Sequence, residues 1–198
     1  MGAHARTNSP SGSRRWLACP GSERMIRQAT EQGLVDAPGP WAAEGSALHS
    51  GAERQVWHLI TGEGDAVALG DDLGEGYLAD AERLEAIQYY ATYITRLLGG
   101  KTPTLFGVET QVDLSRYLPD WFGTADFWWL DTDTSTLHVV DAKFGRKPVD
   151  AENNPQLMIY ALGLLDELDL YAEVKNVQLH IVQPRLAGAD EEEVSDGR

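Results

Sequence analysis

The sequence predicts an α/β protein with a central mixed, mostly antiparallel sheet flanked by helices. Residues 22–100 carry apolar side chains at spacings of three and four, the pattern of amphipathic helices. Residues 104–144 change to β-branched and aromatic runs, which favour strands. One further helical pattern and one further strand pattern follow. The resulting order of helices, three strands, helix and strand implies a mixed sheet.

The N-terminal segment SPSGSRRWLACPGS, residues 9–22, is punctuated by Gly, Ser and Pro. This composition predicts an ordered loop rather than a helix, with Trp16 as its aromatic anchor. Ser22 is expected to cap a short helix that stops at Gly33. Two longer helices are then expected, and a glycine pair ends the second of them. They cover residues 41–62 and 80–100.

Three antiparallel strands are expected next, because the turn compositions YLPD and DTDTS separate the β-branched runs. These strands cover residues 104–114, 121–130 and 136–144. A helix follows over residues 153–168, with Asn154 at its cap and Pro155 at its first position. The run NVQLHIVQP, residues 176–184, predicts the last strand.

The length favours a single domain over residues 1–198, since domains cluster near roughly 100–200 residues. Within it we expect a helical part (1–100), a sheet-and-helix part (101–185) and a solvated acidic tail (186–198). No apolar run approaches the ~20 residues of a membrane span, and the N-terminus lacks the apolar core of a signal peptide. We therefore expect a cytoplasmic protein with no membrane partner.

The net charge of −15 argues against a protein that merely coats a polyanion. Arginines nevertheless gather near the N-terminus, and four of them are expected to line a path for DNA if the protein binds it. They are Arg14, Arg15, Arg24 and Arg27. Cys19 is the only cysteine, which excludes an internal disulfide and a metal site made wholly of cysteines from this chain.

The stretch VVDAKFG places Asp141 and Lys143 on one face of a strand. If Leu130 pairs with Leu137 across the turn, Asp126 falls opposite Asp141, with Cβ atoms about 4.5–5.5 Å apart. Two carboxylates this close require a shared proton or a cation between them. Oxygen ligands of this kind favour Mg²⁺ or Mn²⁺.

A plainer interpretation stands beside the metal site. An isolated Asp-x-Lys on a strand is most often a solvent-facing ion pair, and a helical histidine such as His49 is most often a surface residue. Gln156 and Tyr160 share a helix face, which is also common on a polar surface. Small residues in FGTA before the first acid favour close approach of backbone to a site instead.

Taken together, GTAD, then DAK, then QLMIY, with a helical histidine upstream, resemble the PD-(D/E)XK nuclease superfamily. The pattern is similar to the RecB-like branch, which includes lambda-type exonucleases and the CRISPR-adaptation nucleases. The N-terminal SPSGSRRWLACPGS followed by AAEGSALH resembles phage-encoded members. The resemblance covers roughly residues 9–183 and implies a restriction-endonuclease-like core.

The resemblance implies a role for each matching residue. Lys143 would be the catalytic lysine, and Gln156 and Tyr160 would form the QxxxY element that positions DNA or the active site. The metal ligands would be His49, Asp126, Asp141, the backbone carbonyl of Ala142 and, on the first strand, Glu109.

The implied activity is hydrolysis of DNA phosphodiester bonds with Mg²⁺ or Mn²⁺, by an exonuclease of DNA recombination or repair. Iron–sulfur members need four cysteines, so no such cluster is expected here. The implied partner is DNA, with a phage recombination partner or a homo-oligomer left open, and a phage protein would act in the host bacterial cytoplasm. Two alternatives remain: a non-catalytic DNA-binding or assembly subunit on the nuclease scaffold, and a purely structural α/β domain.

Overall fold

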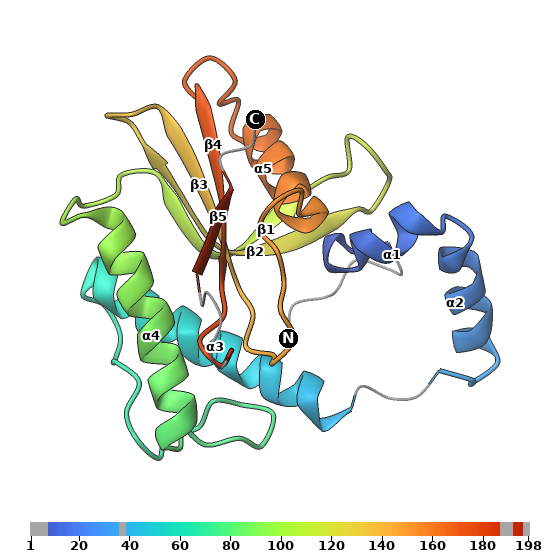
Figure 1. Ribbon diagram of the computed structural model, residues 1–198, viewed down its shortest axis with the longest axis horizontal. Helices are drawn as coiled ribbons and strands as arrows, with labels where there is room; N and C mark the ends of the chain where they lie inside the picture. The colour runs from blue at the N-terminus through green and yellow to red at the C-terminus, as the bar shows by residue number, and fades with distance from the viewer. Residues whose placement is uncertain (1–7, 36–38, 187–191, 196–198) are drawn as a thin grey trace.

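A computed structural model describes residues 8–35, 39–186 and 192–195 of the chain (Figure 1). Between residues 22 and 182 the helices and strands follow the predicted order. The helices are η1 (a 3₁₀ turn, Pro10–Gly12), α1 (Ser13–Ala18), α2 (Ser22–Glu31), α3 (Pro40–Thr61), α4 (Ala81–Leu98) and α5 (Pro155–Glu167). The strands are β1 (Phe106–Asp113), β2 (Phe122–Asp131), β3 (Thr136–Ala142), β4 (Asn176–Val182) and β5 (Glu192–Ser195).

The strands form one sheet in the order β1-β2-β3-β4-β5. β3 and β4 run parallel, with α5 as the connection between them, and the other three pairs are antiparallel. The sheet is therefore mixed and mostly antiparallel, as the sequence predicts. Within the described ranges, no helix combines the length and apolar character that a bilayer span requires.

Helices cover both faces of the sheet. α3 and α4 lie on one side and α5 on the other (Figure 1). Alternate residues of the central strands divide between two cores: Phe127 and Val140 join the core under α3 and α4, whereas Trp128 and Val139 join the core under α5. All residues of β3 are buried, because a strand covered on both faces has no solvent side.

The helix caps of α4 and α5 follow the sequence pattern. Asn154 accepts hydrogen bonds from the N–H groups of Gln156 and Leu157, and Pro155 is the first residue of α5. Gly99 ends α4 at a φ of 58°, a conformation that favours glycine. These caps set the start of α5 and hence the positions of Gln156 and Tyr160.

The N-terminal segment is helical where the sequence predicts a loop, since η1 and α1 occupy it. The indole N–H of Trp16 donates to the carbonyl of Ser9 at 3.0 Å, and its ring meets Trp121 edge-on at 6.0 Å. This long-range aromatic contact orders the turn. Ser22 does not cap α2: Gly21 holds that position, and the Ser22 hydroxyl accepts from Arg15 at 2.9 Å.

The predicted acidic tail contains β5, which pairs antiparallel with β4. Without β5, β4 would be an edge strand with one row of unpaired backbone groups, and pairing satisfies them. A backbone requirement of the sheet therefore outweighs the polar composition of this segment.

Candidate metal centre

The two acids meet where the β2–β3 ladder ends. Leu130 pairs with Leu137, as predicted, and the ladder continues to the pair of Phe127 with Val140. One step further the same register sets Asp126 opposite Asp141. There the Ala142 N–H donates to Asp126 Oδ2 at 2.7 Å. Both acids are buried, with 8% and 2% of their surfaces exposed, so neither points into bulk solvent.

Asp141, Lys143, Gln156 and Tyr160 form one hydrogen-bonded group, called here the Lys143 network. The Lys143 ammonium lies 2.8 and 3.0 Å from the two Asp141 oxygens and donates to Gln156 Oε1 at 3.0 Å. The Gln156 amide donates to Asp141 Oδ1 at 2.8 Å and to the Tyr160 hydroxyl at 3.2 Å. The structure thus joins two pairs of residues that the sequence places on separate elements, one pair on a strand and the other on a helix.

His49, Glu109 and Asp126 form a second group, called here the His49 cluster. His49 Nδ1 lies 3.4 Å from Glu109 Oε1 and 3.5 Å from Asp126 Oδ1. One ligand atom from each residue lies within 4.8 Å of the others, a spacing that can hold a metal ion. The ring of Phe144 meets the imidazole edge-on at 5.2 Å and holds it in place. The two carboxylates supply oxygen ligands, which Mg²⁺ and Mn²⁺ prefer, and the imidazole adds a nitrogen ligand.

Backbone strain brings Glu109 into this cluster. Its φ of 45° is unusual for a residue other than glycine and occurs in the middle of β1. The pairing of β1 with β2 skips the step between Val108 and Thr110, which is where Glu109 would face Asp126. Asp126 is therefore unpaired on both sides, because the β1–β2 pairing skips it and the β2–β3 ladder ends at its neighbour Phe127. Strained residues of this kind concentrate at functional sites.

Electrostatics in the centre show an excess of negative charge. Burial raises the pKa of Asp126 to about 7, with His49 opposing this shift and Asp141 adding to it. Burial lowers the pKa of His49, but the charges of Asp126 and Glu109 raise it more, to about 9. The same balance leaves the pKa of Lys143 above its ordinary value, since Asp141 outweighs burial. A cation in the centre would relieve this repulsion.

Asp141 is the predicted ligand that the His49 cluster does not include. Its Oδ1 accepts hydrogen bonds from Lys143 and Gln156, while its buried Oδ2 forms no hydrogen bond among the described residues despite its 2.8 Å distance from the Lys143 ammonium. Oδ2 is thus the atom of Asp141 that a metal could use. For Ala142 the contact seen is through its N–H. Its carbonyl as a ligand stays a prediction.

Gly123 supports the interpretation of FGTA as a place of close approach. A Cβ atom there would lie 2.5 Å from the ring of Tyr160 and 2.7 Å from Pro10. Only glycine lets α5 and the N-terminal segment press against β2 at this point. The position of Tyr160 in the Lys143 network therefore depends on this residue.

Sequence reasoning missed two residues beside the centre. Tyr90 on α4 is buried, and its hydroxyl has no partner among the described residues. Burial and then the charges of Asp126 and Glu109 hold its pKa far above the ordinary value. Glu53 has a raised pKa from burial and then from Glu109. Glu53 lies four residues after His49, so the helical spacing could have predicted that both face the same site. The sequence pattern of α4 contains no comparable indication for Tyr90.

The four predicted DNA-path arginines lie on α1 and α2, outside the centre. Arg15 forms an ion pair with Glu23 at 2.7 Å, which compensates its charge. Arg14 is exposed and lies 4.0 Å from Asp150, in the segment between Lys143 and α5. Arg24 and Arg27 are exposed on α2, which stands away from the sheet (Figure 1). Their role toward DNA stays a prediction.

Comparison with known protein families places the chain in a described family. The model of the family described as "Protein of unknown function (DUF2800)" matches residues 4–197. The match spans nearly the whole chain, so the chain belongs to this family.

Proposed function

We propose that this protein is a metal-dependent deoxyribonuclease that hydrolyses DNA phosphodiester bonds. The observation that carries the proposal is the meeting of the His49 cluster and the Lys143 network at one buried break in the sheet. Surface ion pairs do not need a strained backbone, a gap in the strand pairing and a buried acid with a raised pKa, as Asp126 has. Such features are typical of functional sites.

The proposed metal ligands are His49, Asp126 and Glu109, with Asp141 contributing the oxygen that has no hydrogen bond. A bound Mg²⁺ or Mn²⁺ would lower the pKa of a coordinated water and withdraw charge from the scissile phosphate. Thiolate ligands are absent from the described part of this centre, so an iron–sulfur cluster is not proposed.

Lys143 is proposed to act on the reacting phosphate or the attacking water. Its raised pKa keeps the ammonium charged at neutral pH, so it can donate to a phosphate oxygen or orient a water molecule. Gln156 fixes the position of this ammonium, because its amide accepts from Lys143 and donates to Asp141. Tyr160 in turn accepts from Gln156 and so holds the amide in place.

The resemblance to RecB-like nucleases supports DNA as the substrate and action from strand ends, in recombination or repair. The arginines of α1 and α2 remain the proposed contacts for the DNA backbone. Replacing Arg14, Arg24 and Arg27 together should weaken DNA binding steeply at low salt, since each phosphate contact adds to the salt dependence.

The test is cleavage of linear and circular DNA with Mn²⁺ and with chelator. We expect Mn²⁺-dependent loss of linear DNA by the wild-type protein and none by Asp141→Asn. Lys175→Ala is the matched control, since this exposed lysine precedes β4 at the other end of the sheet. Calorimetry with Mn²⁺ completes the design. If the protein binds DNA, and binds Mn²⁺ only when Asp141 is present, but does not cleave DNA, the result would instead indicate a non-catalytic subunit on the same scaffold.

A further inference from the structure

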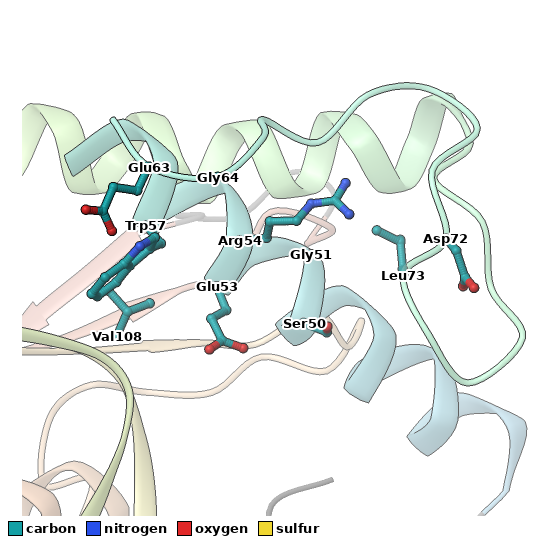
Figure 2. Close-up of a pocket in the computed structure, with 10 residues that line it drawn as sticks. All are labelled: Ser50, Gly51, Glu53, Arg54, Trp57, Glu63, Gly64, Asp72, Leu73 and Val108. Atoms are coloured by element: carbon teal, nitrogen blue, oxygen red, sulfur yellow. The ribbon is translucent and has the colours of Figure 1, made fainter. Parts of the chain in front are cut away.

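A pocket of about 480 Å³ lies directly beside the His49 cluster, between α3, β1 and the segment that joins α3 to α4 (Figure 2). Ser50 and Val108, which line it, are the chain neighbours of His49 and Glu109. Glu53 lines the pocket from α3, as Ser50 does, and its pKa is raised by burial and then by the charge of the nearby Glu109. The volume falls within the range of about 300–1,000 Å³ that is typical of small-ligand sites. None of the proposed metal ligands lines this pocket, so it is a separate place for a ligand beside the metal centre.

The walls combine an aromatic surface with acidic groups. Trp57 is 42% exposed, and its ring tilts against Phe106 at 6.2 Å. Figure 2 shows the Trp57 indole and the Glu53 carboxylate on the side of α3 that faces Val108. Glu63 and Asp72 add further carboxylates, and the one lining arginine, Arg54, is already paired with Asp71.

This combination selects against a phosphate and in favour of a flat ring that carries N–H groups. Carboxylates repel phosphate but accept hydrogen bonds from the amino groups of nucleobases. An indole offers a stacking surface to any base. The spacing of four residues aligns His49, Glu53 and Trp57 along α3, over a length of about 12 Å. A nucleotide next to the phosphate at the metal centre could therefore reach the pocket.

We propose that this pocket receives one unpaired nucleobase of the DNA strand, stacked on Trp57 and donating its exocyclic amine to Glu53. The inference rests on the proposed function, because it takes DNA as the ligand of the neighbouring metal centre. It adds a substrate class: a strand that is single-stranded or frayed where it meets the metal, with cytosine preferred over thymine, which lacks the amine.

The test measures binding of labelled single strands of about ten nucleotides, a length in the range of single-strand sites. The strands are oligo(dC), oligo(dT) and an abasic strand of equal length, with Ca²⁺ in place of the ions expected to support cleavage. Trp57→Ala should weaken oligo(dC) binding about tenfold or more and leave abasic binding unchanged. Glu53→Ala should remove the preference for oligo(dC) over oligo(dT).

Two variants serve as controls. Trp41→Ala removes a tryptophan of the same helix that is 79% exposed and outside the pocket, and binding should stay within about twofold. Trp57→Phe keeps an aromatic ring and should retain most of the affinity, which identifies stacking even if Trp57→Ala folds poorly.

The outcomes separate this inference from the proposed nuclease. Equal losses on base-bearing and abasic strands, or no loss with Trp57→Ala, would overturn the base pocket even if the enzyme cleaves DNA. Base-dependent binding through Trp57 would support the pocket even if no cleavage is found. Failure to bind any of the strands would overturn it as well.

Discussion

The Lys143 network and the His49 cluster meet at the same place yet differ in how tightly they are held. Hydrogen bonds of 2.8–3.2 Å link every member of the Lys143 network. The His49 cluster is held by contacts of 3.4 and 3.5 Å, around a strained Glu109. Apart from Asp141 Oδ2, the side-chain polar atoms of the Lys143 network are engaged with one another, whereas the acids of the His49 cluster are spaced more loosely. This difference fits the proposed division of roles, in which the Lys143 network would position a reacting group and the His49 cluster would bind the ion.

The largest expected difference between the two groups comes from the substitution Lys143→Ala. We expect DNA cleavage to fall by about a hundredfold or more, because the charged donor at the phosphate is lost. Mn²⁺ affinity should change much less, since the His49 cluster is untouched. Cleavage rates and calorimetry on the same preparation measure both effects. Full cleavage by this variant would remove Lys143 from the mechanism.

The pH dependence of metal binding sharpens the description of the His49 cluster. The metal must displace the protons on Asp126 and His49, whose pKa values are about 7 and about 9. Affinity should therefore rise with pH: about a hundredfold per pH unit below 7, where two protons leave, and about tenfold per unit between 7 and 9. Titration with Mn²⁺ from pH 6 to 8.5 measures this slope. An affinity independent of pH would contradict the role of these two residues as ligands.

Gly123→Ala should displace Tyr160 and so disturb the Lys143 network without changing any of its members. The new methyl group would collide with Tyr160 and Pro10, and we expect the free energy of unfolding to fall by about 1–3 kcal/mol. Gly45→Ala is the control, because it lies in α3 with no atom near its Cβ position, and it should stabilise the protein slightly. Chemical denaturation compares the two. Equal stability of both variants would rule out the close packing at Gly123.

The smallest expected effect is a gain in stability from Glu109→Asn. Asparagine tolerates a positive φ better than glutamate and removes one negative charge from the cluster. The metal-free protein should gain about 1 kcal/mol while Mn²⁺ binding weakens. Thermal unfolding with and without Mn²⁺ separates these effects, and a loss of stability without metal would show that Glu109 is not strained.

Much of this architecture could be predicted from local patterns. The register of Leu130 with Leu137 follows from the short turn between two alternating strands, and it placed Asp126 opposite Asp141 correctly. Asn154 and Pro155 mark the start of α5, from which the spacing of Gln156 and Tyr160 follows. These features depend on neighbours in the chain, so a linear pattern contains them.

Other features could not be predicted because they depend on contacts between distant segments. The helix α1 exists where a loop was expected because Trp16 packs on Trp121. β5 forms within an expected tail because β4 offers it an unpaired edge. The buried hydroxyl of Tyr90 near the acids results from how α4 packs on the sheet.

By itself, the sequence determined the order of the elements from α2 to β4, the pairing of the central strands and the candidate residues for an ion site. Only the tertiary structure decided that these residues form two groups of different tightness, with a pocket beside one of them. The physical reason is that alternation and turns act over a few residues, whereas desolvation, charge repulsion and backbone strain arise once remote segments are packed together.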